Sequence, residues 1–230
     1  SLGQALGLIV GCFSSAWNPF FMSYKDRQEE AKQEFGIVMW WFCFGIGLCT
    51  LLFFVFARLL VLIMTDLSFH PAFLVVGMTA LGQAIGGVFA ILVPPFYFRG
   101  DIWRVGLAQG FAAGFSLALG YLGIQKFSFV GAAFAISIAH LITCFGIWMW
   151  LRSKPDRYLQ VDFPWLRIAR FMVFITMVCA ISLIDRSWSV TVEGFVASAV
   201  AIAALWGGWF FLEITEQATV IERLKRYFSR

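Results

Sequence analysis

Charge is scarce in this chain: Asp, Glu, Lys and Arg make up 13% of its 230 residues, and hydrophobic residues make up 61%. The mean hydropathy is +0.84. A soluble domain of this composition would expose large apolar patches and aggregate. The composition therefore excludes most soluble enzymes. No basic patch interleaved with aromatic residues is present, so we expect no binding to nucleic acid.

Cysteine and histidine are also few. The five cysteines stand apart in apolar stretches, without a CxxC pair or a Cys/His cluster (Cys12, Cys43, Cys49, Cys144 and Cys179). Inside a membrane such residues behave as small apolar side chains. Their odd number and isolation predict neither a disulfide framework nor a metal site, and we expect no cofactor.

Catalytic motifs are missing as well. The sequence has no GxSxG, no HExxH, no P-loop and no GxGxxG followed by a strand. Asp156 and Asp162 are too few, and too close to basic residues, for a membrane glycosyltransferase. Asp66, Asp185 and Glu193 are expected to face water at the ends of apolar stretches. We therefore predict that the protein is not an enzyme.

Long apolar stretches dominate what remains. A helix needs about 20 apolar residues to cross a bilayer, and backbone groups in lipid must be bonded internally, which favours helices. We predict an all-α fold, a polytopic transmembrane helix bundle of about seven spans. The spans are expected at about 1–23, 36–61, 71–96, 102–123, 128–150, 163–184 and 190–212.

Lysine and arginine are distributed unevenly over the loops between these spans. Of the 17, only Arg58, Lys126 and Arg186 fall on one side, and the other 14 fall on the opposite side. The positive-inside rule places the richer side in the cytoplasm. We therefore expect a multi-pass protein of the cytoplasmic membrane, with residue 1 outside and the C-terminus inside.

The segments suggest part of a larger protein. The chain opens inside a span without an initiator Met, and seven spans starting outside predict the C-terminal part of something longer. We expect five spans in 1–150, two additional spans in 151–212 and an amphipathic cytoplasmic tail in 213–230. Helix-favouring residues predict that Ser23–Glu34 prolongs the first helix.

Small residues recur at every fourth position on three spans. They include Gly3, Gly7, Gly11 and Ser15 on the first span, Gly82 and Gly86 on the third, and Gly106, Gly110 and Gly114 on the fourth. Such faces allow membrane helices to approach closely. We predict helix contacts at all three.

Polar residues inside the spans follow the same helical spacing, so each set occupies one helix face. Such faces commonly line a bundle interior or an aqueous cavity; the alternative is hydrogen bonding between helices. We take the set to line a substrate cavity, with Arg58 added as a cation that could bind a diphosphate or extend to the membrane surface. The candidates are Gln4, Asn18, Gln83, Gln109, His140 and Arg58.

Proline marks candidate hinges. Pro19, Pro94 and Pro95 lie near the cytoplasmic ends of their spans. Proline removes a backbone donor and kinks a helix. Kinks at one membrane face are suited to gating, although many membrane helices contain proline without gating anything.

Two segments resemble a known family. Ala16-Trp17-Asn18-Pro19-Phe20 resembles the AWxPF signature of polysaccharide flippases, the oligosaccharidyl-lipid branch of the multidrug/oligosaccharidyl-lipid/polysaccharide exporter superfamily. Leu119–Gly123, followed by Phe129–Ala133, resembles that family's short outer turn and the G-A-A that follows it. The resemblance implies one lobe, plus two terminal spans, of a two-lobed exporter.

The resemblance also implies a function. The family moves a polyprenyl-diphosphate-linked oligosaccharide across the bacterial inner membrane by alternating access, for cell-surface polysaccharide such as lipopolysaccharide or exopolysaccharide. The implied partners are this lipid-linked substrate, membrane lipids and a missing N-terminal lobe. Family cavities are typically cationic, whereas the middle of these spans has no Lys or Arg. The alternatives are a cation-coupled drug antiporter of the same superfamily and a non-transporting membrane scaffold.

Overall fold

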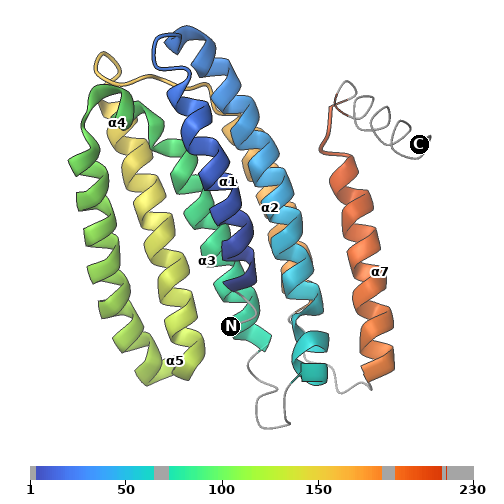
Figure 1. The fold of residues 1–230 in the computed structure, drawn as a ribbon. Helices are drawn as coiled ribbons and strands as arrows, with labels where there is room; N and C mark the ends of the chain where they lie inside the picture. Colours follow the sequence, from blue (N-terminus) through green and yellow to red (C-terminus); the bar gives the residue numbers. More distant parts are fainter. Residues whose placement is uncertain (1–3, 65–72, 183–189, 214–215, 217–230) are drawn as a thin grey trace.

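The computed structural model describes residues 4–64, 73–182, 190–213 and 216. Throughout this described part the regular structure is helical, which confirms the predicted all-α helix bundle (Figure 1). The elements in chain order are α1 (Ala5–Met22), α2 (Gln28–Met64), α3 (Phe73–Leu92), α4 (Pro94–Arg99), α5 (Ile102–Ser153), α6 (Trp165–Ser182) and α7 (Val190–Trp209). The predicted amphipathic tail lies outside the described residues, apart from Glu213 and Glu216.

Helix α5 reverses direction within its length. Eight residues of straight helix rise about 12 Å, yet a Cβ added to Gly123 would lie 2.9 Å from the carbonyl oxygen of Gly131. The chain therefore folds back between these glycines. It forms two antiparallel arms, Ile102–Lys126 and Val130–Ser153, which correspond to the predicted fourth and fifth spans (Figure 1).

Six helical segments in the described part are long and apolar enough to cross a membrane. They are α1, most of α2, α3 together with α4, the two arms of α5, and most of α7. The chain is thus a multi-pass membrane protein. Helix α6 accounts for the predicted span that carries Arg167 and Arg170.

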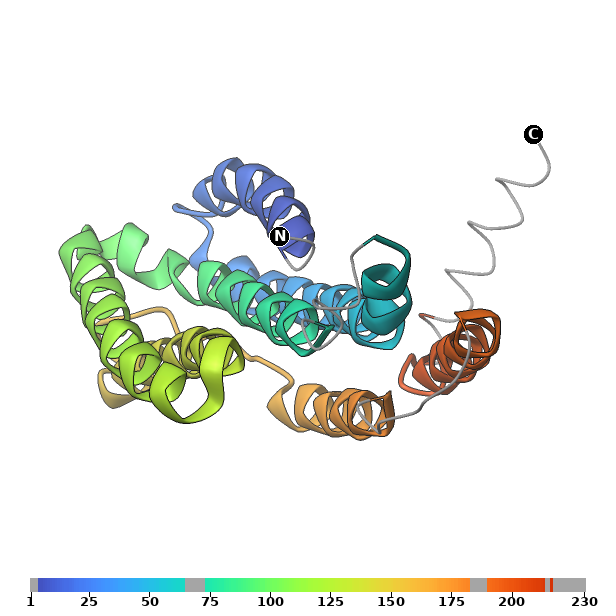
Figure 2. The same ribbon diagram turned by 90° about the horizontal axis from the view of Figure 1, so that it is seen from below.

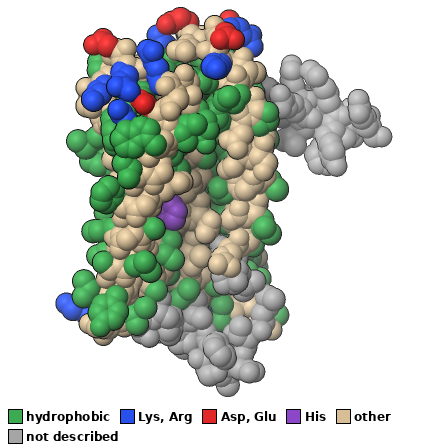
Figure 3. Space-filling model, turned by 60° about the vertical axis from the view of Figure 1, so that its left-hand side comes forward, with side chains coloured by type: hydrophobic (Ala, Val, Ile, Leu, Met, Phe, Trp, Pro, Cys, Tyr) green, Lys and Arg blue, Asp and Glu red, His purple; other side chains and the backbone are tan. Residues whose placement is uncertain are grey.

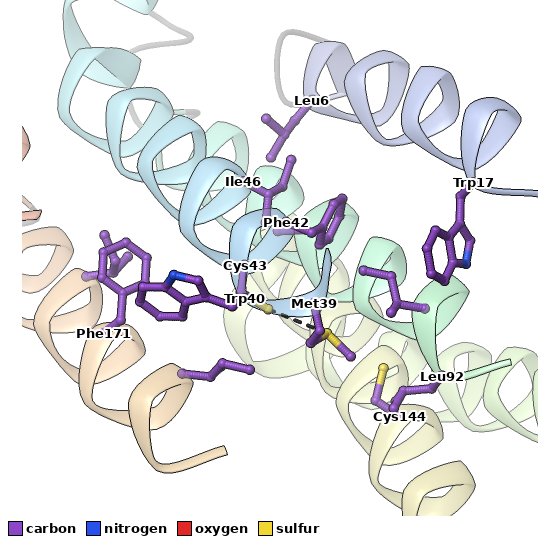
Figure 4. Packing of buried hydrophobic residues seen from close by; sticks show 14 of the residues in the cluster. Leu6, Trp17, Met39, Trp40, Phe42, Cys43, Ile46, Leu92, Cys144 and Phe171 are labelled. Carbon is purple, nitrogen blue, oxygen red and sulfur yellow. Dashed lines mark hydrogen bonds between the residues drawn. The ribbon is translucent and has the colours of Figure 1, made fainter. Parts of the chain in front are cut away.

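Helices α2 and α3 form the centre of the bundle. Seen along the helices, α1 and α5 flank α3, and α6 and α7 lie beside α2 (Figure 2). The buried side chains are mostly aromatic and aliphatic, and Trp40 meets Phe171 edge to face at 5.9 Å between ring centroids. Figure 4 shows this packing, in which the Sγ of Cys43 lies 3.8 Å from the Sδ of Met39. These contacts hold the central helices as one unit.

The loop after α1 departs from the prediction. Helix α1 ends at Met22, a turn follows, and α2 begins at Gln28. The helix-favouring residues therefore extend the second helix instead of the first. The ion pair between Lys32 and Glu29, with 2.7 Å between nitrogen and oxygen, adds local support to that first part of α2.

Charged side chains of the described residues gather at one end of the bundle (Figure 3). Two ionic clusters occur there. In the first, Asp101 accepts hydrogen bonds from the Nη2 of Arg157 and the hydroxyl of Tyr158, each at 2.7 Å. Arg104 in turn donates to the Tyr158 hydroxyl at 2.7 Å. This cluster joins the start of α5 to the loop that follows it.

The second cluster surrounds Arg167 in the first turn of α6. Its guanidinium carbon lies 3.9 Å from the centroid of the Trp40 ring, and its Nη2 donates to the carbonyl oxygen of Phe211 at 2.9 Å. Glu213 and Glu216 pair with the same arginine. The end of α7 is thereby tied to α2 and α6.

Candidate functional site

Two of the predicted cavity residues, Gln83 and His140, lie at two contacts of α3, one with α1 and one with α5. Gln83 of α3 faces α1, where a Cβ added to Gly7 would lie 2.9 Å from its Oε1. Three residues further along α3, a Cβ added to Gly86 would lie 3.3 Å from the Nε2 of His140 on α5. A polar side chain of α3 therefore lies against a glycine of α1, and a polar side chain of α5 lies against a glycine of α3. We call Gly7, Gln83, Gly86 and His140 the polar line.

The polar line lies near the middle of the bundle. His140 is ten residues from the start of the second arm of α5, which is about 15 Å of helix. The Nδ1 of His140 is 2.9 Å from the carbonyl oxygen of Ile136. A proton on Nδ1 would donate to that oxygen and leave Nε2 as an acceptor beside Gly86.

Three further candidates lie on open helix faces. Gln4 and Asn18 are exposed on α1, and Gln109 is exposed on the first arm of α5. Gln109 is not part of the polar line, because its arm presents the neighbouring Gly106 and Gly110 to open space.

Arg58 lies at the other end of the bundle. It is partly buried, and its guanidinium carbon is 5.9 Å from the centroid of the Phe73 ring. The cation is therefore held at the end of α2 and the start of α3. The structure does not bring it together with Gln83 or His140.

The prolines predicted as hinges divide into two kinds. Pro94 and Pro95 are buried and start α4, so that α3 ends at Leu92 and the helix is interrupted at Val93, whose backbone keeps a helical conformation. Pro19 instead lies inside α1 and is exposed. The helix is thus broken just before Pro94 and Pro95, whereas α1 continues through Pro19.

Trp17 of the AWxPF-like segment stabilises the break at Pro94. Because Pro94 has no N–H, the carbonyl of Ala90, four residues earlier, loses its usual helical donor. The indole Nε1 of Trp17 donates to this carbonyl at 3.0 Å. The tryptophan is 3% exposed and contacts the ring of Phe35 edge to face. Sequence reasoning found the motif but missed this bond, since its acceptor lies on another helix.

One acidic residue is placed differently from the prediction. Glu193, expected to face water, is 7% exposed in the first turn of α7. Its Oε2 is buried without a hydrogen-bond partner in the described part of the chain. The reason is that α7 packs on α2, where a Cβ added to the adjacent Gly194 would lie 3.7 Å from Leu59. The sequence around Glu193 did not predict this burial, because its residues are mostly apolar on every side of the helix.

Comparisons with protein-family models, with curated proteins and with solved structures find no match for this chain. The flippase resemblance of Ala16–Phe20 and Leu119–Ala133 therefore stays a prediction. Three features of the structure bear on function: the polar line, the open face of α1 and the helix break at Pro94.

Proposed function

We propose that this protein is a membrane transporter that moves a polyprenyl-diphosphate-linked oligosaccharide across the cytoplasmic membrane by alternating access. The observation that carries the proposal is the polar line near the middle of the bundle, in which Gln83 lies against Gly7 of α1 and His140 lies against Gly86, one turn further along α3. Polar groups at that depth are costly in lipid and are usually retained for a pathway or a partner.

The open face of α1 supports the same proposal. Asn18 is exposed, and a Cβ added to Gly11 would meet nothing within 4 Å. An exposed polar face on a membrane helix needs water or another helical unit against it. We propose that a second lobe covers this face and that the sugar passes between the two lobes. Hydroxyl groups of a glycan suit amide and imidazole partners.

The helix break gives the proposed transport cycle a place to bend. Transporters commonly rock one helical unit against another around a midplane site. Here the interruption at Val93 separates α3, which carries Gln83, from α4 at the charged end. Movement of α1 against α4 would open or close the cytoplasmic side while the polar line stays in place.

The proposal is tested with the protein in liposomes that contain a labelled polyprenyl-diphosphate oligosaccharide. An enzyme added outside reports label that has crossed the bilayer. We expect protein-dependent exposure, and a decrease of roughly 5- to 30-fold for Gln83→Leu or His140→Phe, because each removes hydrogen bonds to the passing substrate. Thr176→Val is the matched control, since Thr176 is exposed on α6 and donates a hydrogen bond to the carbonyl of Met172 in the same helix.

The absence of label exposure above empty liposomes would refute the flippase. Equal loss in Thr176→Val and Gln83→Leu would show a general packing effect in place of a substrate path. Retained activity in both Gln83→Leu and His140→Phe would show that the substrate path does not pass the polar line.

Glu193 favours a second candidate, a cation-coupled drug antiporter. Such a mechanism requires an acidic residue within the membrane, and Glu193 is buried in a predicted span. Efflux of a cationic dye that is driven by a proton or sodium gradient and abolished by Glu193→Gln would establish this candidate. Dye efflux that persists in Glu193→Gln would exclude this carboxylate from coupling.

A further inference from the structure

An apolar groove runs along the outside of the bundle from the charged end. Its floor is formed by α2 and α3, and its sides by the second arm of α5 and by α6, with a volume of about 560 Å³. On α6 it extends from Trp165 to Ile175, ten residues or about 15 Å of helix. Half of a hydrocarbon core of about 30 Å has the same length. The groove therefore spans one leaflet.

A polar cavity of about 450 Å³ adjoins the groove at the charged end. Trp148, Arg152 and Trp165 line both spaces. The two indoles meet edge to face, with 5.8 Å between ring centroids, and the Arg152 guanidinium lies 5.5 Å from the Trp148 ring. Tryptophan is enriched where hydrocarbon meets head groups. The indole pair thus marks that boundary between an apolar space and a polar one.

Two opposite charges line these spaces: Arg152 at the junction and Asp162 in the polar cavity. Both residues are exposed. Among the ion pairs of the described residues, none joins them to each other or to another residue. A site with one cation and one anion suits a zwitterion, whose phosphate would meet the guanidinium and whose ammonium would meet the carboxylate.

We infer that this site binds one phospholipid with a phosphoethanolamine head group. One acyl chain lies in the groove, the phosphate pairs with Arg152, and the primary ammonium donates hydrogen bonds to Asp162. An anionic glycerol head group lacks the cation for Asp162, and a choline head group has no N–H to donate. The site is separate from the polar line, because the groove opens between α5 and α6 and not toward α1.

The test uses the complete protein purified in detergent. Bound lipid is measured by native mass spectrometry, and the thermal midpoint is measured with added phosphatidylethanolamine, phosphatidylglycerol or phosphatidylcholine. We expect phosphatidylethanolamine to bind roughly tenfold more tightly than the other two, as one charge-assisted hydrogen bond would give. It should also raise the midpoint most.

Three variants separate the parts of the site. Arg152→Gln is expected to weaken all three phospholipids, and Asp162→Asn to remove only the preference for ethanolamine. Ala169→Phe fills the groove, because Ala169 lines it, and is expected to abolish lipid retention. Lys154→Gln is the control, since Lys154 is exposed in the same loop and lines neither space.

Equal binding of the three lipids by the wild type, or an unchanged preference in Asp162→Asn, overturns the inference. So does retention of lipid by Ala169→Phe. If that variant does not fold, the two charge variants decide alone. Displacement of phosphatidylethanolamine by a polyprenyl phosphate, with loss of label exposure in Arg152→Gln, would assign the groove to the transported lipid. A failed flippase assay leaves the phosphatidylethanolamine result standing.

Discussion

The two arms of α5 are consecutive apolar segments of similar length, yet they differ in how they pack. The second arm buries Ala133, Ala135 and Ala139, and its Ser137 donates a hydrogen bond to the Met78 carbonyl on α3 at 3.0 Å. The first arm presents large apolar side chains outward, among them Phe111, Leu117 and Tyr121.

Glycines show the same difference. A Cβ added to Gly82 of α3 would meet the Ser137 hydroxyl at 3.1 Å, whereas one added to Gly106, Gly110 or Gly114 would meet nothing within 4 Å. The contacts predicted at Gly82 and Gly86 are confirmed. The contact predicted for the first arm is not formed within the described chain. Small residues permit close approach, but a helix is buried only where a complementary face is available.

The first arm is therefore held mainly at its ends. At one end the chain reverses between Gly123 and Gly131. At the other, Asp101 just before the first arm is bonded to Arg157 and Tyr158 just after the second. A groove between the arms, lined by residues of both that include glycines and aromatic residues, has a volume of about 820 Å³. Substitutions at either end of the first arm test this difference between the two arms.

The largest effect is expected at the reversal. Gly131→Leu places a side chain against the backbone of Gly123, so the arms cannot close. We expect a loss of at least about 3 kcal/mol in the free energy of unfolding and a sharp fall in folded yield. Gly110→Leu, which meets open space, is the matched control and should fold like the wild type. Folding of both variants in equal yield would contradict the close approach at Gly123.

A smaller effect is expected at the contact between α1 and α3, the helix on which the second arm packs. Trp17→Phe keeps an aromatic ring but removes the donor to the Ala90 carbonyl. A buried acceptor left unpaired costs about 1–3 kcal/mol, measured by denaturant or thermal unfolding in detergent. Trp41→Phe is the control, because Trp41 is 38% exposed. An equal cost for both variants would mean that the bond at Ala90 is unimportant.

The smallest effect is expected at the Asp101 cluster. The hydrogen bond from Tyr158, the hydrogen bond from Arg157 and the charge of Arg104 hold the pKa of Asp101 below its ordinary value of 3.8. Burial, and then the bond to Asp101, raise the pKa of Tyr158 above its ordinary value of 10.0. A lowered carboxyl pKa contributes stability above 3.8 that is lost as the pH falls through the lowered value.

Protease protection of 154–164 should therefore be constant between pH 7 and 5, as measured by the rate of cleavage in this loop. Asp101→Asn should increase cleavage at pH 7 and leave Gly123–Gly131 protected. The exposed Asp156, replaced by Asn, is the control. Protection that already declines at pH 6 would require another titrating group.

Much of this architecture follows from the sequence alone. Apolar stretches of about 20 residues between charged loops fix helices that cross a membrane, because lipid offers the backbone no other hydrogen-bond partner. The alternation of the helices also gathers Arg99, Arg157 and Arg167 at the charged end, and Gln83 and His140 follow helical spacing in both the sequence and the structure.

Which helix faces meet depends on packing between distant parts of the chain. The stripes at Gly82 and Gly106 look alike in sequence, yet one meets Ser137 and the other meets open space. Glu193 is buried, and Trp17 finds a carbonyl 73 residues away. Local spacing determines which residues share a helix face. Burial and hydrogen bonding depend on the helix that packs against that face, and this partner is set by distant parts of the chain.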